Sequence, residues 1–116
     1  MTVYVDDVRH RFGRMVMCHM WADTTEELHA AAQGLGLRRS WFQAPPKASW
    51  EHYDISLSVK AQAIANGAIL TDKYGPVEHT SRLRLEHENE VVRLRAREML
   101  DRVAICRAQA KQDRLL

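Results

Sequence analysis

Long hydrophobic runs and cysteines are scarce in this chain of 116 residues. No stretch approaches the ~18–20 consecutive apolar residues that a membrane-spanning helix needs, so no membrane association is expected. The two cysteines, Cys18 and Cys106, lie in neither a CxxC nor a Cys/His zinc spacing, which excludes a disulfide-stabilised miniprotein. The first residues also lack the basic and apolar segments of a secretory signal. Together these absences favour a cytoplasmic protein with reduced thiols.

Familiar cofactor and catalytic motifs are missing as well. The sequence has no GxGxxG, Walker, HExxH, EF-hand or GxSxG motif, so no motif requires a cofactor and an enzymatic activity stays undecided. What is present is an ordinary globular composition, with 46% hydrophobic and 28% charged residues, which excludes a disordered chain. The formal net charge of +2 is too small to indicate nucleic-acid binding by itself.

The order of short apolar segments predicts a small α/β or α+β domain over residues 1–75, with one sheet and two helices. About four short strands are expected, at residues 3–5, 15–22, 38–43 and 68–71. The first two strands are close enough in sequence to pair with each other. Residues 9–13 between them are expected to form a basic connector with a glycine turn.

Capping residues mark where the two helices of this domain begin. Thr24 followed by Glu27 fits a capping box, and the helix that it starts is expected to stop near Gly34 or Gly36. A second helix is expected after Ser56 or Ser58, and Asn66-Gly67 ends it in the usual way.

The remaining residues, 76–116, predict one long C-terminal helix, because no proline or glycine occurs between Glu78 and Gln112. Positions spaced alternately by four and three residues form a heptad seam along it. A homodimer or coiled coil would use Leu85, Asn89, Val92, Ala96, Met99 and Val103. The alternative is an arm that packs back on its own domain. Nucleic-acid binding is a further alternative, because residues 82–116 carry nine basic and six acidic side chains.

Polar side chains near the expected strand ends are candidates for chemistry. His19, His52 and Asp54 are the candidate catalytic residues, because histidine exchanges protons near neutral pH and a carboxylate can orient it. Asp6 and Asp7 close the first expected strand and could bind a divalent cation in a metal-assisted phosphodiesterase. The opposing interpretation gives the histidines structural roles and makes the two aspartates a turn.

A nucleotide-type ligand site is the second functional interpretation. Aromatic rings can stack on a base, and cationic side chains can bind phosphate. The ligand-binding candidates are Arg38, Arg39, Trp41, Gln43, His52, Tyr53 and Lys60. The opposing interpretation places Trp41 and Phe42 in the core.

Short motifs follow one another in the first part of the chain. They are Val3–Asp7 (VYVDD), Cys18–Met20 (CHM) with Ala22–Thr24 (ADT), Glu26–His29 (EELH), Trp41–Gln43 (WFQ) and His52–Asp54 (HYD). In their order and spacing the chain resembles a family of short phage and bacterial proteins classed as a domain of unknown function, over about residues 2–71. The resemblance implies the cytoplasm of a bacterial host cell. It also groups seven residues in one pocket, namely Asp6, His19, His29, Gln43, His52, Tyr53 and Asp54.

The leading hypothesis is therefore a small phage-type protein that binds or hydrolyses a nucleotide-like or phosphorylated small molecule in a pocket at the strand ends. The alternative is an interaction module, or a modulator of a host process, that assembles through its C-terminal helix. The identity of the ligand, the metal and the partner stays open at this point.

Overall fold

The computed structural model describes residues 2–115. The chain divides into two compact units, one ending at Lys73 and the other beginning at Tyr74. The first unit holds one sheet of five strands, where about four were expected, and the second unit holds two α-helices. The predicted mixed α/β class is confirmed. Among the described residues, no helix is long and apolar enough to cross a bilayer.

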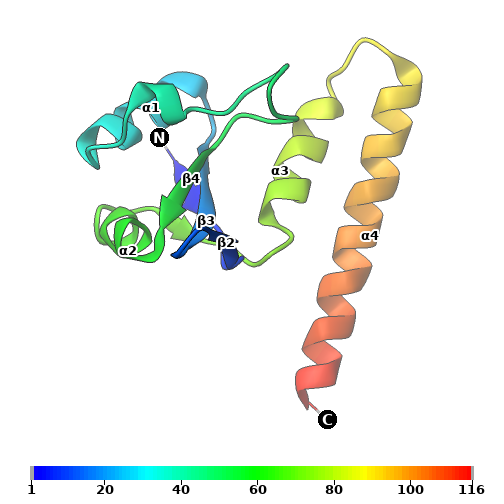
Figure 1. Ribbon diagram of the computed structural model, residues 1–116. Coiled ribbons are helices and arrows are strands. Elements are labelled where there is room, and N and C mark those ends of the chain that lie inside the picture. Colours follow the sequence, from blue (N-terminus) through cyan, green and yellow to red (C-terminus); the bar gives the residue numbers. More distant parts are fainter. Residues whose placement is uncertain (1, 116) are drawn as a thin grey trace. The chain divides into compact units, whose positions relative to one another are not determined.

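The longest strand, β3 (Met15–Ala22), organises the sheet (Figure 1). It pairs antiparallel with three strands, which are β1 (Val3–Val5), β2 (His10–Phe12) and β4 (Tyr53–Ser56). The predicted pairing of the first strand with residues 15–22 is confirmed. The short strand β5 (Ile69–Leu70) pairs parallel with β1. Every strand thus connects directly or through β1 to β3.

Helices α1 (Thr25–Gly34) and α2 (Leu57–Ala65) lie on the same side of the strands (Figure 1). Their predicted caps are confirmed, since the Thr24 hydroxyl accepts from the Glu27 amide and the Ser56 hydroxyl accepts from the Val59 amide. The core between helices and sheet consists of Val5, Cys18, Met20, Ala22, Leu28, Ala32, Tyr53, Ile55 and Ala63. These strand residues alternate along the chain, so one face of the sheet carries the core.

Two expectations for the first unit are wrong. Residues 10–12, expected within a connector, form β2, because Gly13 has a φ of +61° and closes a tight hairpin turn onto Met15. Residues 38–43, expected as a strand, form the 3-10 helix η1 (Arg39–Trp41) followed by a single bridge from Gln43 to His52. A strand does not continue there because Pro45 and Pro46 have no amide hydrogen to pair.

The second unit corrects the expectation of one uninterrupted C-terminal helix. It has α3 (Gly75–Arg84) and α4 (Glu90–Leu115), separated by a short turn. Asn89, the one polar residue of the expected seam, is the N-terminal cap of α4. Its side-chain oxygen accepts hydrogen bonds from the backbone amides of Val91 and Val92. Leu85 is the C-terminal cap of α3 and also lies outside α4.

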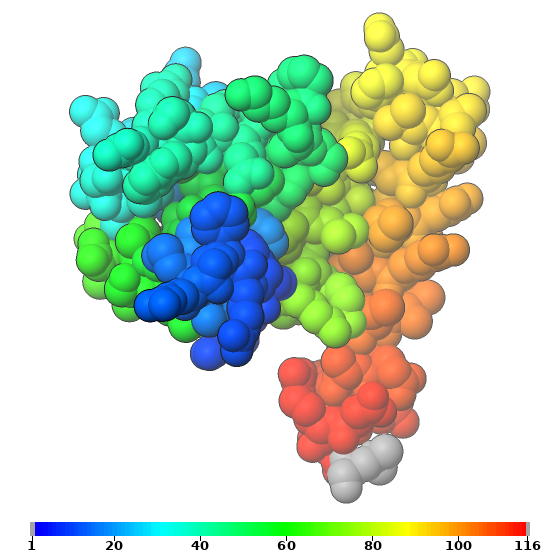
Figure 2. Space-filling model, viewed as in Figure 1, coloured from blue at the N-terminus to red at the C-terminus, as the bar shows by residue number. Residues whose placement is uncertain are grey.

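Part of the expected seam is buried. Ala96 and Val103, seven residues apart on α4, are 4% and 3% exposed. Arg107 on α4 bonds to Glu78 on α3 at 2.6 Å, which ties the two helices together. Other apolar side chains of α4 are exposed, including Leu94 and Ile105, and Figure 2 shows much of this helix in orange and red at the surface. Self-association through α4 stays a prediction.

Candidate metal centre

Strand register brings three titratable side chains together on one face of the sheet. His19 of β3 lies opposite Asp54 of β4, and residues paired across an antiparallel ladder point to the same face. His10 of β2 pairs with Met17, two residues before His19. Because side chains alternate along a strand, all three point away from the face that carries the core residue Cys18.

The carboxylate of Asp54 lies among three imidazoles. Its Oδ1 is 3.5 Å from Nε2 of His52, 3.8 Å from Nε2 of His19 and 4.0 Å from Nε2 of His10. This oxygen is buried, and it accepts no hydrogen bond from any residue in the range 2–115. A buried carboxylate oxygen without a donor is costly, so something outside the described contacts is needed to explain it.

Hydrogen bonds on the far side of two rings fix the direction of their free nitrogens. Nδ1 of His19 lies 2.7 Å from the Asp6 carboxylate, and Nδ1 of His52 lies 3.1 Å from the carbonyl oxygen of Trp50. Both partners are acceptors, so we assign a proton to each Nδ1. In the neutral rings the lone pair is then on Nε2, the atom that faces Asp54.

Asp6 and Gln43 form hydrogen bonds that orient His19 and Asp54, respectively. Asp6 is completely buried, and besides its contact with the imidazole it accepts from the backbone amide of His19 at 3.0 Å. Gln43 donates from its side-chain amide to Oδ2 of Asp54 at 2.6 Å, leaving Oδ1 for the histidines. Carboxylate, imidazole and amide are therefore each oriented by a second group.

Electrostatic coupling shifts the pKa of two members. Burial opposes the imidazolium of His19, but the hydrogen bond and charge of Asp6, with the charge of Asp54, raise the pKa of His19 above its ordinary value. The proximity of His52 lowers the pKa of Asp54, against burial and with help from Gln43 and His19. Asp54 is thus an anion at neutral pH, and positive charge beside it is favoured.

Trp50 forms an aromatic wall beside the histidines. Its indole stacks on His52 with a centroid distance of 4.2 Å and meets His19 edge-on at 5.5 Å. Trp21 contacts the same indole at 5.6 Å. Rings on this side keep water away and strengthen the electrostatic interactions of the group.

The donor atoms have the chemistry and spacing of a transition-metal site. Donor atoms of His10, His19 and Asp54 lie within 4.8 Å of one another. His52 is not a member of that group of three, although its Nε2 is 3.5 Å from Oδ1 of Asp54. Ligands at about 2.1 Å from one zinc ion lie about 3.4 Å apart, so donor atoms separated by as much as 4.8 Å would have to move closer to bind one ion together. Imidazole nitrogens with one carboxylate suit zinc, cobalt, nickel or iron, whereas calcium and magnesium prefer oxygen ligands.

Five residues that the sequence proposed meet in this cluster, which holds Asp6, His19, Gln43, His52 and Asp54. Asp6, expected as a metal ligand, orients His19 instead. Asp7, its neighbour, is exposed and forms an ion pair with Lys60 at 3.0 Å, so these two candidates bind each other.

The remaining candidates lie elsewhere. Tyr53 is buried in the core, where its hydroxyl bonds to His29 and its ring packs against Phe42, so it has no free face for a base. Arg38 lies over the ring of exposed Trp41 at 5.7 Å, and Arg39 is exposed on η1. The basic clamp expected around a phosphate is therefore not formed by these side chains around Asp54.

Two members of the cluster were missed by sequence reasoning. His10 was assigned to a connector, although the order His10-Arg11-Phe12, Gly13-Arg14, then Met15 has the glycine-containing two-residue turn of a hairpin. Trp50 is the second, and no local sequence pattern marks it as an aromatic neighbour of the histidines.

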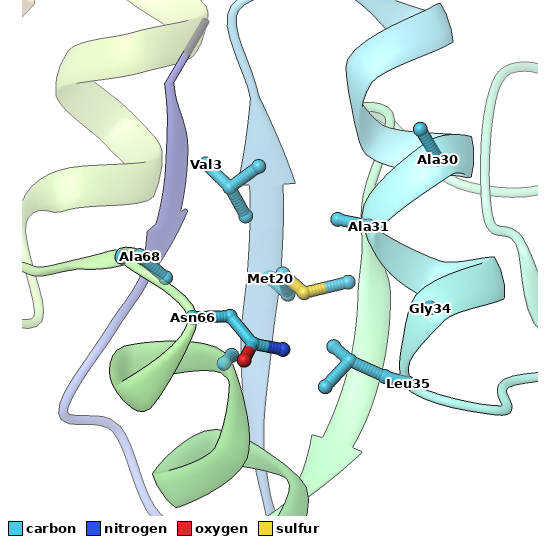
Figure 3. A pocket seen from close by; sticks show the side chains of 10 residues that line it. Val3, Met20, Ala30, Ala31, Gly34, Leu35, Asn66 and Ala68 are labelled. Carbon is cyan, nitrogen blue, oxygen red and sulfur yellow. The ribbon is translucent and has the colours of Figure 1, made fainter.

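A cavity of about 280 Å³ lies on the opposite face of the sheet, beside α1 (Figure 3). It is lined mainly by small and apolar side chains such as Val3, Ala31 and Leu35, and Asn66 supplies its polar side chain. None of its lining residues is titratable, so it offers no acid, base or metal ligand. The chemistry of the first unit is concentrated on the histidine face.

Comparison with known proteins places the chain in a family. No curated protein and no solved structure matches it. A family model described as "Protein of unknown function (DUF4031)" matches residues 3–84, from β1 to the last residue of α3. The match extends past the sequence motifs, which ended near residue 71. Since it spans more than half of the chain, the chain belongs to the DUF4031 family of proteins of unknown function.

Proposed function

We propose that the protein binds a divalent transition-metal ion through His10, His19, His52 and Asp54, and that this ion holds the oxyanion of a phosphorylated small molecule. One observation carries the proposal. The buried Oδ1 of Asp54 has no hydrogen-bond donor among residues 2–115, yet the Nε2 atoms of three histidines surround it. A cation bound between these atoms satisfies the carboxylate and the lone pairs together.

A network of protonated histidines is the competing explanation, and the geometry favours it less. An imidazolium beside a buried carboxylate would donate a short, charge-assisted hydrogen bond. The nearest Nε2 atom, on His52, is instead at 3.5 Å, while the Asp6 contact to His19 is as short as 2.7 Å. The Nδ1 atom of His19 is thus hydrogen-bonded to a carboxylate while the Nε2 atoms face Asp54 without a hydrogen bond, as in carboxylate–histidine–metal sites.

The centre is open on one side, which suits a site that receives a ligand. The side chains of His10, His19 and Asp54 are 35%, 23% and 31% exposed. Zinc can expand from four to five ligands during catalysis, so a centre with four protein ligands can still take one oxygen of a bound molecule from its exposed side. The metal would supply the positive charge that the arginines expected around phosphate do not. On the motif resemblance to phage and bacterial proteins, we place this activity in the cytoplasm of a bacterial host.

A metal titration of the full chain tests the proposal. The protein is stripped with a chelator, dialysed and titrated with Zn²⁺ by calorimetry, and then with Co²⁺, whose visible absorption reports the ligand geometry. We expect one ion per chain. We expect His19→Ala and Asp54→Asn to weaken binding at least about 100-fold, because second-sphere changes alone cost 10- to 100-fold.

The control is His87→Ala, which removes an exposed histidine from the turn before α4. It should bind metal as the parent does. Circular dichroism confirms that each variant is folded. Absence of stoichiometric binding by the folded parent contradicts the proposal, and so does equal binding by the parent and the two cluster variants.

A further inference from the structure

A groove of about 600 Å³ shares two residues with the histidine cluster. Asp54 and Gln43, which belong to the cluster, are among its lining residues, whereas His10, His19 and His52 are not. Its other walls are mainly apolar, with Phe12 and Met15 from the β2–β3 hairpin and Trp41 from η1. The volume lies in the range of pockets that hold small organic molecules.

We infer that the ligand of this centre has an uncharged aromatic or other apolar body, which lies in the groove while its oxyanion reaches the metal. The inference rests on the proposed function, because the metal ion defines the polar end of the ligand. It goes further by stating what the rest of the ligand must be.

Charge distribution in the groove supports this division. No lysine or arginine is among its lining residues, and Arg38 lies over the ring of Trp41, with its guanidinium carbon 5.7 Å from the ring centroid. The other polar side chains that line the groove are Ser40 and Ser56, and the Ser56 hydroxyl already accepts from the Val59 amide as the cap of α2. A highly charged body, such as a polyphosphate chain, would therefore be disfavoured.

Apolar side chains of the groove are exposed to water, and a bound apolar group would cover them. Phe12 is 73% exposed and Trp41 is 49% exposed, and the two come from segments far apart in sequence. Arg38 covers one part of the Trp41 ring, while Trp41 also lines the groove. Aromatic rings at such a site bind planar groups by stacking and by removing apolar surface from water.

The test compares two ligands with the same head group. Methylphosphonate and phenylphosphonate are titrated separately into the Zn²⁺-loaded full chain by calorimetry. Their binding to the Co²⁺-loaded chain is followed by the change in visible absorption, which reports contact with the metal. Each methylene removed from water is worth about a fourfold gain in affinity, so we expect phenylphosphonate to bind at least about tenfold more tightly.

Three variants locate the phenyl ring. Trp41→Ala and Phe12→Ala, which change exposed groove residues in separate segments, should each reduce the preference severalfold while metal binding is unchanged. Leu70→Ala is the matched control, because Leu70 is 51% exposed and is not a groove residue; it should keep the full preference.

The outcomes separate this inference from the proposed function. If the folded parent binds no metal, the proposed function fails before any phosphonate is added. If metal binds but the two phosphonates bind equally, the groove inference is overturned and the metal centre stands. A phenyl preference that survives both groove substitutions also overturns it, because the ring then lies elsewhere.

Discussion

Replacing Asp6 with asparagine is the most informative change at the proposed metal centre, because it replaces a charged acceptor by a neutral donor with almost no change in volume. Oδ1 of Asp6 accepts from the His19 amide, so the oxygen of an asparagine must keep that position. The amide nitrogen then faces Nδ1 of His19, where the carboxylate oxygen was at 2.7 Å. Two donors cannot meet, so His19 must move its proton to Nε2.

That tautomer removes the lone pair that faces Asp54, and metal affinity falls. Loss of a second-sphere carboxylate typically costs 10- to 100-fold in metal affinity. We therefore expect Asp6→Asn to weaken Zn²⁺ binding by that factor, about 1.4–2.7 kcal/mol. The assay is a competition titration against a chromophoric chelator, with nitrogen NMR of the imidazole to identify the protonated nitrogen of His19.

Asp7→Asn is the matched control, since Asp7 is the next residue, is exposed and pairs with Lys60 outside the cluster. It should leave both the affinity and the His19 tautomer unchanged. The reasoning is refuted if Asp6→Asn folds, moves the proton to Nε2 and still binds Zn²⁺ as tightly as the parent. In that case His19 is not a ligand.

Three further predictions concern the fold around the site. Gly34→Ala should raise the free energy of unfolding, measured in a urea titration, by about 0.5–1 kcal/mol, because Gly34 is helical and a Cβ there meets nothing within 4 Å. Gly67→Ala should lower the free energy of unfolding by at least about 1 kcal/mol, because the backbone φ of Gly67 is +103°. Burial, and then the charge of Arg39, lower the pKa of His29 in the folded protein. The unfolded chain therefore binds more protons as pH falls below about 6.5, which opposes folding. In the same assay, the free energy of unfolding of the parent relative to His29→Gln should decrease between pH 8 and pH 5. Cys106 is exposed, whereas Cys18 is buried, and its burial raises the pKa of the Cys18 thiol to about 11. Ellman's reagent should therefore react quickly with one thiol at pH 8, and with the second only after denaturation.

Local signals predicted those parts of the fold that local chemistry controls. The Thr24 cap and the alternation of residues 15–22 depend on neighbours in sequence, and both are present in the structure. The failures occur where distant residues decide. Residues 38–43 have the composition of a strand, but a strand needs a partner on its edge, and only Gln43 finds one.

The C-terminal region shows how a periodic pattern can be correct in part. Ala96 and Val103 keep their heptad spacing and are buried, so the pattern identified a buried stripe. Asn89 was placed on that stripe by spacing alone, although its short amide side chain is also a strong helix cap. Without proline or glycine nearby, the sequence gives no other sign that the helix breaks there.

The sequence predicted several residues of the site but not the way in which they meet in space. His19, His52 and Asp54 were recognised by residue type, but their meeting depends on the register of β3 with β4, which pairs His19 with Asp54. A shift of one residue would turn Asp54 into the core and bring Tyr53 to the histidine face. The exclusion of Tyr53 and the inclusion of His10 therefore have one cause. Strand pairing over long sequence distances selects which candidates share a face, and that selection brings scattered histidines and carboxylates into the one cluster for which we propose metal binding.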